Sequence, residues 1–438
     1  MGVAGTNIAA VDWPDPYLGQ FGGYADEAIS AGDSVIGLMA GNWDTNIDKL
    51  PNIFSDNSRI SGIHFSRDGK YLAITGYKAA GTVCLRIFKI GANDSFAPFK
   101  TLDFAISGSA GALSSVRFSP DSRYLAWIGS NNNTQGLRVW EIVNDDFIDI
   151  ASTVTNPPTW NSNGAYWSPD SKLLAIGNLA SNAGGVVFSV AQGVFSRLNP
   201  SPNMAQALAT YEADFSPDGK YLAVGLSGTS AYGDVPWAIY EFANNVYLSQ
   251  LPTSVLSRRS YTTRCIKFAP NNKYLVLGNS NSPYINIYSI DNSGGSNVYT
   301  AQPNPAVLPT SEPMVIEFTS DGQFLFVFHA SSPYVTAYKI TNNIFGKINL
   351  PVITTALGAG DASFSPSNKY LAVSRHNASS SPTTEQINIY KTRLSNVLLK
   401  ANFNAIGALT GSQGFYGLGR ALTTTPAGQI GQMGVLFR

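Results

Sequence analysis

An eleven-residue pattern that recurs seven times limits the folds open to this chain more than any other feature. Its clearest copy is FSPDGKYLAVG, residues 215–225. The copies begin at seven aromatic residues: Phe65, Phe118, Trp167, Phe215, Phe268, Phe318 and Phe364. Neighbouring copies lie 46 to 53 residues apart along the 438-residue chain. A nearly constant period of this length indicates a repeat architecture in which each copy is one supersecondary unit.

Each repeat predicts four β-strands. The motif contains the end of one strand, a tight turn and a second strand, for example YLAITG at residues 71–76. A third apolar stretch such as CLRIFKI (84–90) follows, and a short polar turn then leads to a fourth, such as VYLSQLP (246–252). In the motif turn, Pro presets φ at the first corner, Asp favours the next position and Gly accepts a positive φ. Four antiparallel strands at this period predict an all-β, seven-bladed β-propeller of four-stranded blades, with eight blades as the alternative.

Two segments compete to complete the ring. SNVLLKAN, residues 395–402, has the pattern of a fourth strand for the seventh blade. NIDKLP, residues 46–51, also resembles the fourth strands of other blades. It would either close the ring from the N-terminal side or belong to a partial eighth blade.

The repeats resemble WD40-like and TolB-like propeller repeats over residues 55–400. The resemblance rests on the FSPDGKYLA units, clearest at residues 215–223. The chain departs from the family pattern because the GH dipeptide is missing and Trp140-Glu141 or Tyr240-Glu241 stands in place of WD. The resemblance therefore implies the propeller fold but no particular activity, since propellers host many unrelated functions.

The two ends of the chain lie outside the repeats. AGDSV (31–35), GRAL (419–422) and AGQIG (427–431) resemble motifs of a small β-domain found in virion proteins of tailed phages. The resemblance implies that the first segment pairs with a strand pair formed by the other two. Residues 1–50 and 404–438 would then form one small domain, into which the propeller, residues 51–403, is inserted. The alternative is two extended arms that wrap the propeller or neighbouring subunits.

Composition narrows the choice of partners and compartment. Only 13% of the residues are charged, and 28 basic residues cancel 28 acidic ones. A neutral chain has no electrostatic footprint for nucleic acid or for an anionic membrane, and low charge suits a surface covered by partners. The N-terminal segment lacks the charged and apolar regions of a secretory signal, and no apolar stretch is long enough to cross a membrane. We expect Cys84 and Cys265, each within an apolar strand-like stretch, to be buried thiols.

The sequence contains little that indicates catalysis. His64 precedes the first motif aromatic, and His329 and His376 follow the motif aromatics of adjacent blades, where they could approach one another. Two histidines without a carboxylate cluster are weak evidence for a metal or an acid–base site. The acidic motif position is occupied by Asp68, Asp121, Asp170, Asp218, Asn271, Asp321 and Ser367. We interpret these as turn residues spread around a rim, and we predict a non-enzymatic protein without metal or cofactor.

Binding is expected on the face opposite the motif turns. The loops between the second and third strands, and the connections between blades, emerge there and vary most in sequence. The candidate binding residues are Trp160, Tyr232, Trp237, Arg258, Arg259, Tyr261, Arg264, His329, Arg375 and His376. The aromatic residues would stack on sugars or anchor a protein, and the three arginines near residue 260 would bind an acidic glycan or a carboxylate.

The sequence therefore predicts a structural or binding protein of a bacteriophage virion. Such a protein would decorate a capsid or tail, or form a fibre, and would present its propeller for attachment or assembly. Its partners would be other virion proteins or copies of itself, contacted through the termini, and a glycan or protein on the host surface. The alternatives are an intracellular WD40-like scaffold and a propeller enzyme that acts on carbohydrate.

Overall fold

The computed structural model describes the backbone of residues 2–4, 7–11, 23–25, 34–38, 48–50, 59–78, 82–92, 94–105, 114–129, 136–158, 164–178, 185–199, 209–227, 236–251, 262–294, 296–350, 359–375, 387–392, 396–402, 415–421 and 430–435. Side chains are described only between residues 50 and 392. Within these ranges the chain is built almost wholly from strands, and the only helical turn is η1 (Ala151–Thr153). None of the described helices is long and apolar enough to span a membrane.

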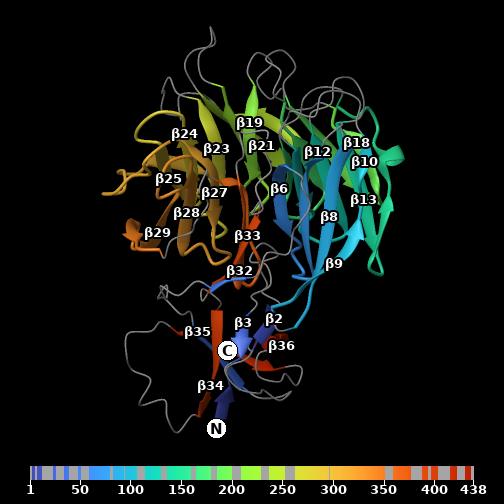
Figure 1. Ribbon diagram of the computed structural model, residues 1–438. Coiled ribbons are helices and arrows are strands. Elements are labelled where there is room, and N and C mark those ends of the chain that lie inside the picture. Colours follow the sequence, from blue (N-terminus) through green and yellow to red (C-terminus); the bar gives the residue numbers. More distant parts are fainter. Residues whose placement is uncertain are drawn as a thin grey trace. The chain divides into compact units, whose positions relative to one another are not determined.

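Seven antiparallel sheets form the blades of a β-propeller (Figure 1). The first three blades are β6 (Arg59–Phe65), β7 (Tyr71–Lys78), β8 (Thr82–Ile90), β9 (Phe96–Thr101) with β10 (Phe104–Ala105); β11 (Ser114–Phe118), β12 (Tyr124–Gly129), β13 (Leu137–Val143), β14 (Asp146–Asp149); and β15 (Ala165–Trp167), β16 (Leu173–Ile176), β17 (Val186–Ala191), β18 (Val194–Arg197). The fourth to sixth are β19 (Thr210–Phe215), β20 (Tyr221–Leu226), β21 (Trp237–Ala243), β22 (Val246–Gln250); β23 (Thr263–Phe268), β24 (Tyr274–Asn279), β25 (Ile285–Asp291), β26 (Val298–Ala301); and β27 (Pro313–Phe318), β28 (Phe324–His329), β29 (Val335–Thr341), β30 (Ile344–Ile348). The prediction of an all-β, seven-bladed propeller is confirmed.

The seventh blade shows how the ring closes. It contains β31 (Ala359–Phe364), β32 (Tyr370–Arg375), β33 (Ile387–Lys391) and, as its fourth strand, β5 (Asp48–Lys49). β5 pairs antiparallel with β33, with Lys49 opposite Tyr390. Residues 48–49 of the N-terminal candidate NIDKLP therefore close the ring, and the described sheets contain seven blades without an eighth. The rival segment SNVLLKAN forms β34 (Asn396–Asn402), which belongs to a different sheet.

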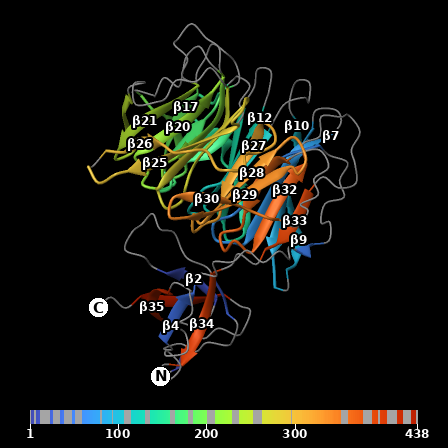
Figure 2. The ribbon, with the colours of Figure 1, turned by 90° about the vertical axis from the view of Figure 1, so that its left-hand side faces the viewer.

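That second sheet is built from both ends of the chain (Figure 2). Its strands are β1 (Gly2–Ala4), β2 (Asn7–Val11), β3 (Gly23–Ala25), β4 (Ser34–Leu38), β34, β35 (Phe415–Ala421) and β36 (Ile430–Val435), in the order β2-β36-β35-β4-β1-β34-β3. β4 pairs antiparallel with β35, which places Val35 opposite Gly419. β35 in turn pairs antiparallel with β36. β4, which begins with Ser34 and Val35 of AGDSV, and β35, which ends with the first three residues of GRAL, are thus direct neighbours. β34 extends this sheet to residues that the sequence interpretation gave to the propeller.

The repeated motif is explained by its turn. The residue after the acidic position has a positive φ of 54° to 72° in all seven blades: Gly69, Ser122, Ser171, Gly219, Asn272, Gly322 and Asn368. In the fourth blade, Ser216 Oγ donates to Asp218 at 2.5 Å and accepts the backbone N–H of Tyr221 at 2.9 Å. Asp218 also accepts the backbone N–H of Lys220 at 3.1 Å. The motif Ser and Asp therefore satisfy backbone donors that the tight turn leaves unpaired.

The motif also joins neighbouring blades. The backbone N–H of Asp68 donates to Ser122 Oγ of the next blade at 2.9 Å, and the N–H of Asp121 donates to Ser171 Oγ at 3.0 Å. The Tyr221 hydroxyl accepts the backbone N–H of Asn297, again from the following blade, at 3.1 Å. Ser122 and Ser171 are two of the positive-φ residues, so a side chain at that turn position can join neighbouring blades where it is not Gly.

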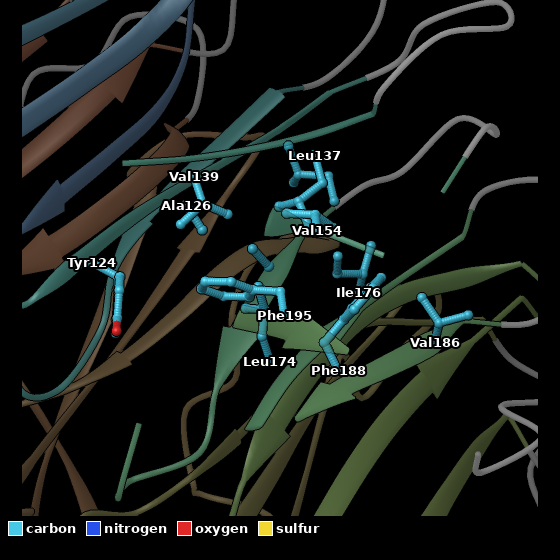
Figure 3. Packing of buried hydrophobic residues seen from close by; sticks show 12 residues of the cluster. Tyr124, Ala126, Leu137, Val139, Val154, Leu174, Ile176, Val186, Phe188 and Phe195 are labelled. Atoms are coloured by element: carbon cyan, nitrogen blue, oxygen red, sulfur yellow. The ribbon is translucent and has the colours of Figure 1, made fainter. Parts of the chain in front are cut away.

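The hydrophobic core lies between the blades. The cluster in Figure 3 combines residues of the second blade, such as Val139, with residues of the third, such as Phe188. All six residues of β12 are buried, as are all six of β20 and of β24. Because neighbouring sheets cover both faces of these strands, the second strands are continuous apolar runs without alternation.

Candidate functional site

Charged side chains from five blades interact with one another near the propeller axis. First strands of successive blades contact one another there. The residue before the motif aromatic is polar in every blade: His64, Arg117, Tyr166, Asp214, Lys267, Glu317 and Ser363. Together with Glu212 and Asp361 from the same first strands, they form what we call the axial cluster. In a chain with 13% charged residues, this concentration makes the axis the first place to look for chemistry.

One strong ion pair spans the second and seventh blades. Arg117 contacts Asp361 through two hydrogen bonds, Nη1–Oδ2 at 2.8 Å and Nη2–Oδ1 at 3.2 Å. The Asp361 side chain is only 7% exposed and the Arg117 side chain 21%. Against the effect of burial, the carboxylate raises the pKa of the Arg117 guanidinium further above its ordinary value. Asp361 also accepts the backbone N–H of Ile63, so the pair ties the first, second and seventh blades together.

The part of the cluster that belongs to the fourth, fifth and sixth blades is mainly acidic. Lys267 Nζ lies 3.5 Å from Glu317 and 4.0 Å from Asp214, so that one cation is shared by two carboxylates. Burial raises the pKa of Glu212 to about 8 and raises the pKa values of Asp214 and Glu317 in the same direction. Despite its burial, Lys267 has a raised pKa because carboxylates surround it. The carboxyl group of Glu212 therefore holds a proton near neutral pH.

Several axial side chains accept hydrogen bonds from the backbone of a neighbouring blade. Five of them accept N–H groups from the inner edge of a neighbouring first strand: His64 from Phe118 at 3.1 Å, Glu212 from Ile266 at 3.2 Å, Asp214 from Phe268 at 2.8 Å, Asp361 from Ile63 at 3.0 Å and Ser363 from Phe65 at 3.3 Å. Innermost strands have no ladder partner on this edge, so these bonds satisfy donors that would otherwise be buried unpaired. The cluster is thereby explained as a set of contacts that hold the ring together. Within the described residues, no group of three or more His, Cys, Asp or Glu side chains could hold a metal ion.

The interpretation of the motif acids as turn residues is supported by the same kind of contact. Asp121 accepts from Ser119 and from the backbone N–H of Arg123, and Asp321 does the same with Thr319 and Gln323. Each carboxylate is engaged within its own turn. The two cysteines are buried, as expected.

Three of the ten predicted binding residues have described side chains, and none of the three is displayed on a loop. Trp237 is the first residue of β21 and only 2% exposed, so its placement on a binding loop was wrong. Its ring packs against Tyr288 of the next blade, with centroids 5.0 Å apart. The signal for this was the apolar run WAIYEF, residues 237–242, which includes the tryptophan as its first member.

Arg264 and His329 are also committed to internal contacts. Arg264 lies on β23, where its guanidinium is 4.7 Å from the Tyr211 ring and forms an ion pair with Glu312. His329 ends β28 and is fully buried, with Nε2 3.0 Å from the Thr336 hydroxyl. Burial lowers the pKa of His329 to about 4, so the ring is neutral at physiological pH. His329 is thus enclosed in the fold, whereas Arg264 keeps a 39% exposed side chain that is paired with Glu312.

The remaining predicted residues are not placed. Trp160, Tyr232, Arg258, Arg259, Tyr261 and His376 lie outside the described residues. Arg375 is the last residue of β32, and its side chain is outside them as well. The arginine cluster and the approach of His329 to His376 therefore stay predictions.

Sequence interpretation missed the axial cluster. The available signal was a polar residue directly before each motif aromatic, because adjacent residues of a strand point to opposite sides. Seven polar residues at one repeat position indicate a shared environment, and the ring brings that position to the axis.

Comparisons with known proteins identify the fold of the chain. No protein-family model matches the chain, and no curated protein matches it. Among solved structures, the β-propeller domain of Swd1 (Cps50) from Myceliophteria thermophila is similar with a TM-score of 0.55 and 12% identity, covering 79% of this chain and 99% of that one. A chain of the mitotic checkpoint complex is similar with a TM-score of 0.52 and 10% identity over 80% and 93% of the two chains. A putative 6-phosphogluconolactonase from Bacteroides uniformis follows at 0.51 and 15%, over 75% and 98%.

These likenesses, together with the blades described above, define the chain as a seven-bladed β-propeller protein with WD40-like neighbours. At 10 to 15% identity, they are similarities of fold alone.

Proposed function

We propose that this protein is a non-enzymatic structural and binding protein: the sheet formed by its two ends attaches it to an assembly, and its propeller is displayed for contact with protein partners. The observation that carries the proposal is the pairing of β4 with β35. Strands separated by the whole propeller in sequence are neighbours in one sheet, so the propeller is an insertion between the two halves of a separate module. Such an architecture suits a chain that is anchored by one part and presents another.

The propeller half of the proposal is supported by the fold and the composition. The solved structures that are similar include a component of the mitotic checkpoint complex, which is a protein assembly. The chain carries few charges, as interface cores do. The proposal that the protein is not an enzyme draws support from the axial cluster, because its charged groups are engaged with one another or with the backbone.

The assembly that we propose is the virion of a tailed bacteriophage, in which the protein decorates the capsid or tail or forms a fibre. Support for this part comes only from the terminal segments, where the resemblance to phage virion domains implied the neighbours that β4, β35 and β36 have. Synthesis would take place in the host cytoplasm, and the partners would be other virion proteins or further copies of the chain.

Mass spectrometry of virions purified from the source tests the proposal. We expect the protein among the particle components. The variant Val35→Pro removes a backbone N–H from β4 opposite Gly419, and we expect it to be lost from particles. Val298→Ser, at an exposed position on the rim of the fifth blade, is the matched control and should stay particle-bound. Absence from particles, together with recovery in complexes with cellular proteins, would instead support the intracellular scaffold.

A further inference from the structure

Two loops on adjacent blades have the same structure and the same sequence ending. They join the second and third strands of the fifth and sixth blades and comprise residues 279–284, NSNSPY, and 329–334, HASSPY. In the first, the N–H of Asn279 donates to the Tyr284 carbonyl at 2.7 Å, and the N–H of Tyr284 donates to the Asn281 carbonyl at 2.9 Å. We call these segments the twin SPY loops.

The second loop repeats these contacts one blade further on. The N–H of His329 donates to the Tyr334 carbonyl at 2.9 Å, and the N–H of Tyr334 donates to the Ser331 carbonyl at 2.8 Å. Thr310 Oγ1 donates to the Ser332 carbonyl at 3.0 Å, and Ser311 Oγ accepts the N–H of Ser331 at 3.0 Å. The loops are therefore ordered, and the same local geometry presents both tyrosines.

The backbone at the two tyrosines is unusual. Tyr284 has φ of 64° and Tyr334 has φ of 66°. Every other described non-glycine residue with a positive φ is Asn, Asp, Ser or Gln, the small or polar types that tolerate this region. A bulky residue held in this conformation twice, at equivalent positions, is the kind of departure from local preference that points to a function.

The two loops themselves contain polar but uncharged residues around the tyrosines. Both side chains are half-buried, and the remaining loop residues are Ser, Asn, Ala and Pro, with His329 buried beneath the second loop. The neighbouring connection, residues 302–312, contains one charged residue, Glu312, which is paired with Arg264. Within the two loops and residues 302–312, the half-buried tyrosines therefore lie on segments of mostly hydroxyl- and amide-bearing residues, whose one charge is paired.

We propose that the twin SPY loops bind a linear, uncharged oligosaccharide, with one sugar unit on each tyrosine. A tyrosine ring offers an apolar face for the C–H groups of a sugar, and hydroxyls and amides supply donors and acceptors for its hydroxyl groups. Two equivalent subsites on adjacent blades match a ligand that itself repeats. Tyrosine is also a common anchor for protein partners, so it is the repetition of the same loop on adjacent blades that leads us to choose an oligosaccharide. This binding site goes beyond the proposed function and does not depend on it.

The test is isothermal titration calorimetry of the full-length protein against linear glucose, mannose and galactose oligomers of one to eight units, in α- and β-linked series. We expect one series to bind, with an affinity that rises about ten-fold or more between a single sugar and the length that spans both loops, because the second contact becomes intramolecular. Tyr284→Asn and Tyr334→Asn should each remove that increase, and the double variant should remove binding. Asn is chosen because Asn272 has the same backbone region, with φ of 54°, in this fold.

Ile344→Asn, at a 69% exposed position on the rim of the sixth blade, is the matched control and should bind like the unmodified chain. Thermal unfolding of all variants checks that they are folded. Absence of binding across the panel would overturn the proposal, as would binding that the folded double variant retains. Loss of a protein partner, without any sugar binding, would assign the loops to a protein interface instead.

Discussion

The two ends of a blade differ in whether the contacts of the fold account for the residues found there. At the motif turn of the fourth blade, Ser216 and Asp218 are satisfied by contacts within the turn. At the opposite end, the twin SPY loops hold Tyr284 and Tyr334 in a backbone conformation that bulky residues avoid. The first region repeats because every blade needs the same turn and the same contact with its neighbour. The second varies because strands can be joined there in many ways, and that freedom is where binding can develop.

The largest effect is expected at the axis, where polar groups are bonded within the fold as they are at the motif turns. Asp361→Ala leaves Arg117 without its carboxylate in a half-buried position and frees the N–H of Ile63. We expect a loss of about 3–5 kcal/mol in the free energy of unfolding, measured by chemical denaturation. The double variant Arg117→Met, Asp361→Leu should recover much of the loss, since no charge is then left unpaired. A loss below about 1 kcal/mol for the single variant would contradict this prediction, because exposed ion pairs contribute no more than that.

A pH-dependent effect is expected from Glu212. Its pKa in the folded protein is about 8, above the ordinary 4.5, so the folded state binds the proton more tightly than the unfolded state. Stability therefore falls as pH rises from about 5 to 8, by up to about 1.4 kcal/mol for each unit of pKa difference, reduced because the carboxyl is only half-buried. Glu212→Gln should reduce this slope and leave the part that comes from Asp214 and Glu317, whose pKa values are raised in the same direction. Unfolding measured at pH 5, 7 and 9 checks it, and a stability difference that is the same at all three values would contradict the assignment.

A smaller effect is expected for one motif hydroxyl. Ser216→Ala leaves the buried N–H of Tyr221 without its acceptor, and we expect a loss of about 1–3 kcal/mol. Ser282→Ala, in the first SPY loop, is the matched change at the other end of a blade and should alter stability by no more than about 0.5 kcal/mol. Equal losses at the two sites would remove the distinction between the two ends.

The smallest effect concerns the turn glycine. Gly219 has φ of 69°, and no atom lies closer than 3.8 Å to the place that a Cβ would take. A side chain there would therefore meet no steric clash, and only the positive φ would disfavour it. We expect Gly219→Ala to cost about 1 kcal/mol and Gly219→Asn to cost less, as Asn272 stands at the same position one blade on. Gly294→Ala, where nothing lies within 4 Å, is the control and should be close to neutral. Identical effects of Ala and Asn would indicate that φ is not what selects the residue.

The fold could be predicted from the sequence because its cause is local. Turn residues at a constant period specify the corner of each blade, and the apolar second strands specify burial between sheets. The choice between residues 46–51 and 395–402 as the closing strand could not be made, because both have the pattern of an edge strand. Their assignment depends on pairing with β33 or with the strands of the termini, which is a long-range contact.

The candidate sites were harder to predict for a different reason. Trp237 and His329 lie at strand ends, where one residue decides between a loop and the core. Arg264 was grouped with Arg258 and Arg259 by proximity in sequence, but it lies on β23 and pairs with Glu312, directly before the first strand of the next blade. The axial cluster needs closure of the ring before Arg117 and Asp361 meet, because 244 residues separate them.

Hydroxyl-radical footprinting of the protein, free and bound to particles from its source, tests the central claim most directly. That claim is that the motif turns specify architecture, while the terminal segments and the face opposite the turns make the contacts. We predict that binding protects residues 1–47 and 393–438, or the loops opposite the motif turns, and leaves the turns at residues 216–220 and 269–273 unchanged. Protection confined to the motif turns would contradict the account.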